Sequence, residues 1–201
     1  TALMWTVDAH IKRSSYPLPP GVEAVNLRGM PQQRQTGDLM SEHILFGSEL
    51  ARSAPTWDDL VWLRQQTRLP LIVKGLLSAR AAAQAVELGA DAIVVSNHGG
   101  RVLDTAVSAL EVLAAIRAAT PAHIPLLMDG GVRQGTDVLK AIALGASAVL
   151  LGRPQMHALA VAGMLGVAHM LYLLRAELEL AMAQTGCARL DQIGPGLLTT
   201  C

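Results

Sequence analysis

The chain has 201 residues, of which 51% are hydrophobic and 16% charged, and its 16 basic and 16 acidic side chains give a formal net charge of zero. This length suits one domain with a sizeable core. The balanced charge and an aromatic content of 3% argue against a nucleic-acid-binding surface. No run approaches the roughly 18 uninterrupted apolar residues of a membrane span, so we expect none.

Short apolar runs alternate with segments of helical length along most of the chain. We expect strands at 2–6, 71–73, 92–95, 124–128 and 148–151. Ala- and Leu-rich stretches predict helices at 78–88, 106–118, 135–144 and 155–185, the last with a break near Gly163 and Gly166. Thr56 and Asp59 have capping-box spacing and mark a further helix start. Continuous apolar strands between helices are typical of βαβ units and of a parallel sheet buried on both faces.

One βα unit is repeated, because residues 88–95 and 144–151 share a Leu-Gly-Ala turn followed by an apolar strand. Such repetition is typical of a (β/α)8 TIM barrel, although doubly wound sheets can show it too. A complete barrel has eight strands in about 250 residues. We therefore expect a single domain, 1–201, that supplies strands 4 to 8 and the C-terminal helices. The N-terminal part would be missing, and the natural chain would begin before Thr1.

The segment 14–54 is rich in proline and glycine and has little periodicity. Because it follows a predicted strand, it would lie at the carboxyl end of the barrel, where active sites are found. Long irregular loops in compact domains are often functional, so we predict a lid over the active site. The alternative is an insertion without a catalytic role.

Polar residues follow all the predicted strands. They are Thr6 and Asp8, Lys74, Ser96–His98, Asp129–Gly131, and Gly152–Arg153. The carboxyl ends of barrel strands meet at one mouth, so these residues predict one site.

Two of these strand ends suit a phosphate group. Asp129–Arg133 and Gly152–Arg153 combine glycine loops with arginine and precede predicted helices. Backbone N–H groups at a helix N-terminus, with an arginine beside them, favour a phosphate dianion. Two ordinary tight turns are the alternative.

Lys74, His98 and Arg101 are the candidates for the chemistry. A lysine on the inner rim of an apolar barrel needs an anionic partner. Lys74 could form a Schiff base or neutralise a charged cofactor ring, and the residues alone leave both open. His98 suits a general base oriented by a nearby carboxylate, either Asp104 or Asp8. Arg101 offers the fork that binds a substrate carboxylate.

Metal and disulfide chemistry are not indicated. The remaining histidines lack metal-ligand spacing. Cys187 and Cys201 form no C-x-x-C pair, so we expect neither a metal site nor a disulfide framework, and a cytoplasmic location.

Together these motifs resemble those of the FMN-dependent 2-hydroxy-acid oxidoreductases. That family includes glycolate oxidase, lactate oxidase, flavocytochrome b2 and mandelate dehydrogenase. The likeness runs from about Thr6 to Gly194. Its most specific motifs are Ser96-Asn97-His98-Gly99-Gly100-Arg101 and Asp129-Gly130-Gly131-Val132-Arg133.

The resemblance implies FMN-dependent oxidation of a 2-hydroxy acid to a 2-keto acid. His98 would be the base, paired with Asp8, while Arg101 would hold the substrate carboxylate. Lys74 would neutralise charge on the flavin ring, which disfavours the Schiff base. The remaining cofactor contacts implied are Thr6 and Ser96 at the ring, Asp129 at the ribityl chain, and Gly130, Gly131, Arg133, Gly152 and Arg153 around the phosphate.

Other implications are less specific. The family's second carboxylate-binding arginine has only Arg13 as a counterpart, displaced by about two positions. Oxygen or another acceptor would reoxidise the flavin, and a homo-oligomer, often a tetramer, is usual. The main alternative is a non-catalytic partial barrel that binds flavin or phosphate or needs a partner fragment. A type 2 isopentenyl diphosphate isomerase is disfavoured, because His98 and Arg101 supply a base and a carboxylate clamp.

Overall fold

The computed structural model describes residues 1–9, 20–22 and 54–199. The chain divides into two compact units, Thr1–Ala9 with Thr56–Cys201, and His10–Pro55. The predicted lid at 14–54 lies outside the described residues except for 20–22 and 54, and Arg13 lies outside them too.

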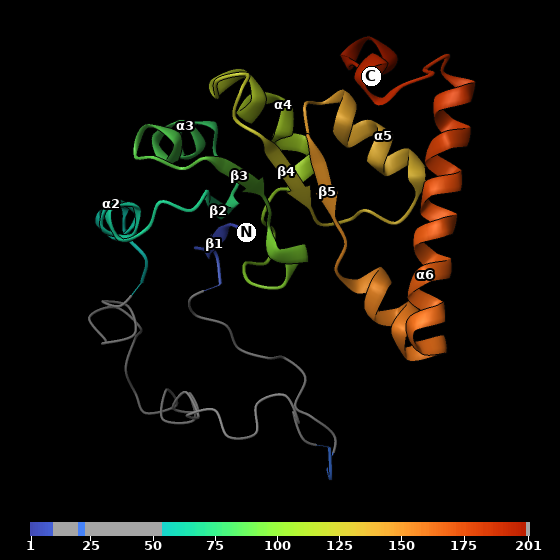
Figure 1. Ribbon diagram of the computed structural model, residues 1–201, viewed down its shortest axis with the longest axis horizontal. Helices are drawn as coiled ribbons and strands as arrows, with labels where there is room; N and C mark the ends of the chain where they lie inside the picture. The colour runs from blue at the N-terminus through green and yellow to red at the C-terminus, as the bar shows by residue number, and fades with distance from the viewer. Residues whose placement is uncertain (10–19, 23–53, 200–201) are drawn as a thin grey trace. The chain divides into compact units, whose positions relative to one another are not determined.

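All the strands of the larger unit are parallel and form one sheet in chain order (Figure 1). The strands are β1 (Leu3–Thr6), β2 (Leu71–Leu76), β3 (Ala92–Val95), β4 (Leu126–Asp129) and β5 (Ala148–Leu150). The helices are α2 (Trp57–Gln66), α3 (Ala79–Glu87), α4 (Ala109–Ala119), α5 (Gly135–Ala143) and α6 (Arg153–Gln184). Short 3-10 helices occupy η3 (His98–Gly100), η4 (Leu190–Gln192) and η5 (Pro195–Leu197). Parallel strands joined in order by helices form part of a (β/α)8 barrel.

The predicted elements are confirmed, with small differences at their ends. α4 begins at Ala109 rather than 106, because the Ser108 side chain caps it by accepting from the Glu111 N–H at 3.4 Å. β4 begins at Leu126, directly after Pro125, which has no N–H to offer a strand ladder.

The core lies between the sheet and its helices. Leu60, Leu71, Leu113, Ile116 and Leu126 are fully buried there. Only β3 is buried along its whole length, whereas buried and partly exposed residues alternate in β4 and through most of β2. The prediction of a sheet buried on both faces is therefore wrong outside β3, because five strands do not close a barrel around their inner face.

Two arginines secure the repeated turns at the amino end of the sheet. Gly89 and Gly145 have φ values of +99° and +104°, which favour glycine. The space that a Cβ would occupy is filled by the Arg64 side chain at Gly89 (Cδ at 2.9 Å) and by the Arg117 side chain at Gly145 (Cγ at 2.5 Å). The sequence repeat thus corresponds to a repeated packing unit.

α6 is broken in the middle, as predicted. Ala162 and Gly163 have non-helical dihedral angles, and a Cβ at Gly166 would lie 2.1 Å from the Ala158 carbonyl oxygen. By its length and by a mean hydropathy of 1.7 in one 18-residue window, α6 could cross a membrane. The expectation of no membrane span was based on uninterrupted apolar runs and did not anticipate this helix. The break divides the helix into two limbs, and Arg175 and Glu177 lie in the second, so one such helix by itself does not establish a membrane span.

Candidate active site

A cavity of about 650 Å³ opens at the carboxyl ends of β2 to β5. Most of the predicted site residues line it, namely Lys74, His98, Arg101, Asp129, Gly130, Gly131, Arg133, Gly152 and Arg153. The predicted residues Thr6, Asp8 and Ser96 are not among its lining residues. The strand ends therefore converge as the sequence predicted.

Lys74 has the anionic partner that its position requires. Its Nζ lies 3.0 Å from Asp129 Oδ2 and donates to Ser96 Oγ at 2.8 Å. The Lys74 and Asp129 side chains are only 13% and 18% exposed. The second Asp129 oxygen, Oδ1, is buried and finds no hydrogen-bond partner within the described part of the chain. An ion pair of this kind fits charge neutralisation better than a free nucleophilic amine.

Ser96 connects the lysine to the histidine loop. It is fully buried, and its hydroxyl also accepts the His98 backbone N–H at 3.0 Å. It directly follows β3 and does not line the cavity, so it supports Lys74 and His98 from behind.

His98 is held by a carboxylate, as expected of a general base. Its Nδ1 lies 3.2 Å from Asp8 Oδ1, with the two side chains 24% and 14% exposed. Because an ionised carboxylate only accepts, this contact favours the tautomer with its proton on Nδ1, in which Nε2 is the acceptor. Asp104, the other candidate, accepts instead from the Thr105 N–H at 2.9 Å. Asp8 Oδ2 is buried without a partner among the described residues.

The backbone around His98 is unusual. His98 has a φ of +56°, a left-handed conformation that is uncommon outside glycine and often marks functional sites. Asn97 stabilises the turn, since its Oδ1 accepts from the Gly100 N–H at 3.2 Å and its Nδ2 donates to the Val107 carbonyl at 3.3 Å. Arg101 follows this turn, exposed and lining the cavity.

The predicted phosphate end has open backbone. A Cβ at Gly131 or Gly152 would meet no atom within 4 Å. Arg153 donates to the Gly99 carbonyl at 3.1 Å, which brings the loop after β5 to the loop after β3. Arg133 is exposed on the other side of the same cavity. These groups can surround a dianion.

The two helix N-termini at this end differ. Asp137 Oδ2 accepts from the backbone N–H groups of Arg133 (3.0 Å) and Gln134 (3.1 Å). Gly135 N–H donates to Glu177 Oε2 at 2.8 Å. The N-terminus of α5 is thus occupied by two carboxylates, whereas Gly152, the N-cap of α6, provides no side-chain cap. Only α6 therefore presents a helix N-terminus suited to an anion.

Sequence reasoning missed both carboxylates. Asp137 lies three positions after Gln134, a capping-box spacing that could have identified it. Glu177 comes from α6, 42 positions from Gly135 in sequence, and no local pattern indicates its role.

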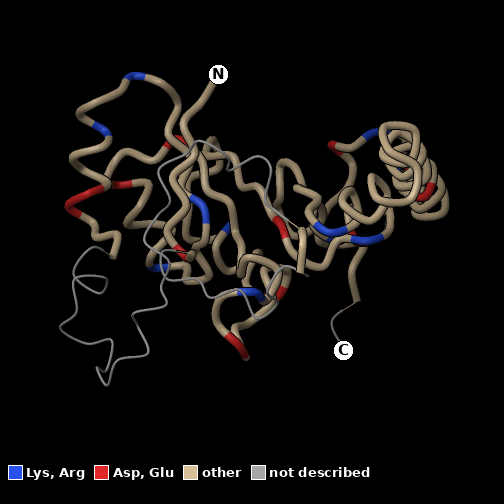
Figure 2. Tube along the Cα trace, turned by 90° about the horizontal axis from the view of Figure 1, so that it is seen from below, with Lys and Arg blue, Asp and Glu red and all other residues tan. Residues whose placement is uncertain are grey.

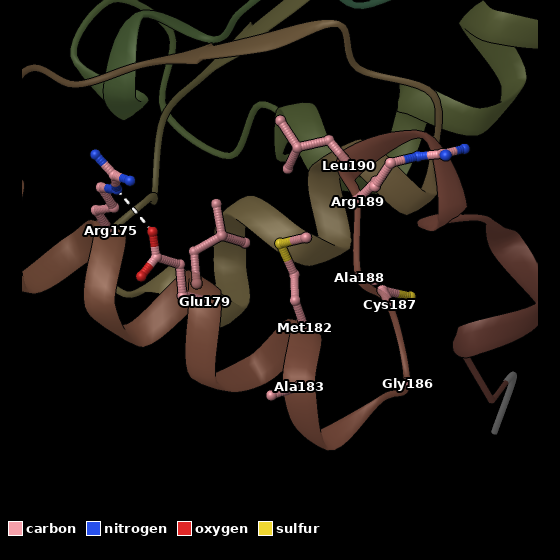
Figure 3. A pocket seen from close by; sticks show the side chains of 10 residues that line it. Arg175, Glu179, Met182, Ala183, Gly186, Cys187, Ala188, Arg189 and Leu190 are labelled. Carbon is pink, nitrogen blue, oxygen red and sulfur yellow. Dashed lines mark hydrogen bonds and ion pairs between the residues drawn. The ribbon is translucent and has the colours of Figure 1, made fainter.

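A second cavity, of about 850 Å³, lies near the end of α6 (Figure 3). Its charged side chains are already paired, Arg175 with Glu179 at 2.7 Å and Arg189 with Asp191 at 3.0 Å. The hydrogen bond that Arg175 donates to Glu179 raises the pKa of Arg175 above its ordinary value. None of the predicted site residues lines it. Elsewhere, basic and acidic residues are interspersed along the described trace (Figure 2).

The fold and the site together define part of a (β/α)8 barrel whose strand ends carry a histidine–carboxylate pair beside a cavity lined by glycines and arginines. The family model described as FMN-dependent dehydrogenase matches residues 1–200, and the chain belongs to this family.

The relatives are named as oxidases of 2-hydroxy acids. An L-lactate oxidase from Alicycliphilus denitrificans is 47% identical over 98% of this chain and 56% of its own length. A 2-hydroxyacid oxidase from Dictyostelium discoideum is 40% identical over 98% of this chain and 52% of its own. The chain spans about half the length of the curated relatives that it matches.

Solved structures agree on the fold. A mandelate oxidase with benzoyl-formic acid is 51% identical, with a TM-score of 0.66 over 69% of this chain and 41% of that one. A mandelate oxidase variant with benzaldehyde has a TM-score of 0.75 and 41% identity over 94% and 52%.

FMN, the cofactor of the family, fits the residues present. The unpartnered Asp129 Oδ1 can accept from a ribityl hydroxyl. The open backbone at Gly131 and Gly152, with Arg133 and Arg153 beside it, suits the phosphate.

Proposed function

We propose that the protein oxidises a 2-hydroxy acid to a 2-keto acid with FMN as its cofactor. The observation that carries this proposal is the His98–Asp8 pair, which shares one cavity edge with Arg101 and with the Lys74–Asp129 pair. When bound, FMN accepts the two electrons that leave the substrate.

Arg101 and His98 act on the substrate. The Arg101 guanidinium binds its carboxylate with two parallel hydrogen bonds. His98 Nε2 takes a proton, either from the α-hydroxyl or from the α-carbon, and Asp8 stabilises the resulting imidazolium. Arg13 is a second candidate for the carboxylate.

The remaining residues hold the cofactor. Lys74 neutralises negative charge beside the flavin ring, and Thr6 and Ser96 contribute to the ring environment. Asp129 accepts from the ribityl chain. The phosphate lies among Gly130, Gly131, Arg133, Gly152 and Arg153.

The test is an anaerobic flavin spectrum of the protein, loaded with FMN, before and after addition of lactate, glycolate or mandelate. We expect at least one acid to bleach the visible flavin band. His98→Gln should slow bleaching by about 10²–10⁴-fold, the contribution of a general base, while FMN still binds. His123→Gln, an exposed histidine before β4, is the matched control and should bleach at the original rate. Bound flavin that no acid bleaches would contradict the proposal.

A second candidate is a non-catalytic partial barrel that binds flavin or phosphate, or needs a partner fragment. It is supported by β1 and β5, each of which pairs with a single neighbour among the described residues. One experiment distinguishes the two candidates. The part of a relative that this chain does not match, for example that of the L-lactate oxidase, is added as a separate polypeptide. Bleaching only after this addition would show that the catalytic residues need the partner fragment.

Oxygen is our proposed electron acceptor, because the curated relatives are named oxidases. Oxygen consumption during turnover tests it. We further propose a homo-tetramer, supported by exposed apolar side chains on α6 such as Val161 and Met164, and light scattering measures it. A cytoplasmic location, and a lid at 14–54 that covers the substrate, complete the proposal.

A further inference from the structure

Gly75 lies where β2 departs from regular strand geometry. Lys74 pairs with Val94 and Leu76 with Val95, so one residue of β2 is left over between them. Gly75 has a φ of +109°, which other residues rarely adopt. A bulge of this kind re-aims the neighbouring side chains. Here Lys74 faces the cavity, while Leu76 returns to the core, where it is 8% exposed.

Asp8 lies directly over this glycine. A Cβ built on Gly75 would lie 2.5 Å from Asp8 Cγ, 2.6 Å from its Cβ and 2.7 Å from Oδ1. Contacts under 3.0 Å essentially never occur at a real Cβ. Rotation of the Asp8 side chain does not relieve the overlap, because Asp8 Cβ is involved. The backbone is also held, since the Val7 N–H donates to the Lys74 carbonyl at 2.9 Å.

The same Asp8 oxygen, Oδ1, is the one that lies 3.2 Å from His98 Nδ1. Any side chain at position 75 would therefore move the carboxylate that orients the histidine. Asp8 Oδ2 is buried without a partner among the described residues, so no other hydrogen bond recorded there holds the carboxylate in place.

We propose that Gly75 is a positioning residue of the active site. Its missing side chain lets Asp8 reach His98, and its bulge turns Lys74 into the cavity. This role rests on the proposed function, because His98 and Lys74 are the groups it places. Gly75 itself touches neither substrate nor cofactor.

The test is the ¹⁵N spectrum of the His98 imidazole in the FMN-free protein at about pH 8, above the ordinary titration range of histidine. In the original protein we expect the Nδ1–H form to dominate, because Asp8 only accepts. In Gly75→Ala we expect a shift toward the mixed forms of a free imidazole, matching Asp8→Ala, in which no acceptor is left at position 8. His98→Gln assigns the signal.

Gly89→Ala is the matched control. Gly89 has a φ of +99°, and a Cβ there would lie 2.9 Å from Arg64 Cδ, so the variant also introduces backbone strain and overlap, but before β3 and not at its carboxyl end, where His98 lies. We expect the His98 signal to stay unchanged. An unchanged signal in Gly75→Ala, or an equal shift in Gly89→Ala, would overturn the proposal.

If Gly75→Ala folds poorly, urea unfolding of the single and double variants at positions 75 and 8 tests the same overlap. If the overlap with Asp8 is the cause, Gly75→Ala should lower the urea midpoint clearly less in an Asp8→Gly background than alone. Equal losses in both backgrounds would refute the overlap. Neither measurement needs flavin or substrate, so a failed bleaching test would leave this result standing.

Discussion

Arginines at the two ends of the sheet differ in how many hydrogen bonds they donate to the protein. At the amino end, Arg64 donates to the carbonyls of Thr67 (2.6 Å), Leu69 (2.9 Å) and Gly89 (3.3 Å) and to Asp91 (2.8 Å). Arg117 likewise donates to Thr120, Pro121 and Ile124. At the carboxyl end, Arg153 has a single recorded acceptor, the Gly99 carbonyl. For Arg101 no acceptor is recorded among the described residues.

This difference separates stability from function. Hydrogen bonds that satisfy partly buried carbonyls at the amino end stabilise the fold, because an unpaired carbonyl there would be costly. At the carboxyl end, Asp8 Oδ2 and Asp129 Oδ1 remain buried and unpaired among the described residues. Such groups destabilise the isolated protein and are expected where a ligand supplies the missing partner.

We expect the largest effect from breaking the Lys74–Asp129 ion pair at the carboxyl end of the sheet. Asp129→Ala should destabilise the protein by about 3–5 kcal/mol, because it leaves the Lys74 charge partly buried without its partner. Urea unfolding measures the loss. The double variant Lys74→Met with Asp129→Leu should recover most of it, since no charge is then left. A double variant as unstable as the single one would contradict this account.

At the amino end, Arg117→Ala should cost about 2–3 kcal/mol, since the carbonyls it satisfies would be left unpaired. Arg101→Ala, at the opposite end, should change the free energy of unfolding by about 0.5 kcal/mol or less, as exposed substitutions do. The same urea titration compares them. Similar losses for the two variants would show that the two ends do not differ in this way.

For FMN affinity, unlike for the free energy of unfolding, we expect arginines at the carboxyl end of the sheet to have the larger effect. Arg153→Ala should weaken FMN binding by about 10–100-fold, the value of a hydrogen bond to a charged group. Binding of riboflavin, which lacks the phosphate, should hardly change. Flavin fluorescence titration gives both affinities. Arg175→Ala, on the exposed second limb of α6, serves as the control, and an equal loss for riboflavin would place Arg153 away from the phosphate.

The smallest effect concerns the exposed start of α2, outside both ends. Thr56 donates to the Asp59 carboxylate from its hydroxyl and its N–H, both at 2.7 Å, and these bonds lower the pKa of Asp59. A lowered pKa stabilises the fold above the unfolded-state value, and the gain disappears as pH falls through the folded-state value. Thr56→Ala should thus lower the urea midpoint slightly at neutral pH, with a gap to the original protein that closes in acid. A gap independent of pH would contradict it.

Local patterns were sufficient for the elements and for most of the site. Buried strands such as 92–95 are visible as apolar runs, and parallel connection places every strand end at one edge. The sequence therefore predicted that His98, Arg101, Asp129 and Arg153 would meet at one site, and the structure places all of them around one cavity. Ser96 was predicted at the same site, but its complete burial and its hydrogen bonds to Lys74 and His98 depend on how the strands pair, which neighbouring residues in the sequence do not reveal.

The sequence by itself determined the order of strands and helices, the edge that carries the chemistry and the family. These depend on periodicity and on short motifs. Only the tertiary structure decided that Glu177 caps α5 and that Gly75 leaves room for Asp8 beside His98. Each of these contacts joins residues far apart in the chain or depends on a backbone bulge, so their geometry exists only once the strands are paired and the helices packed.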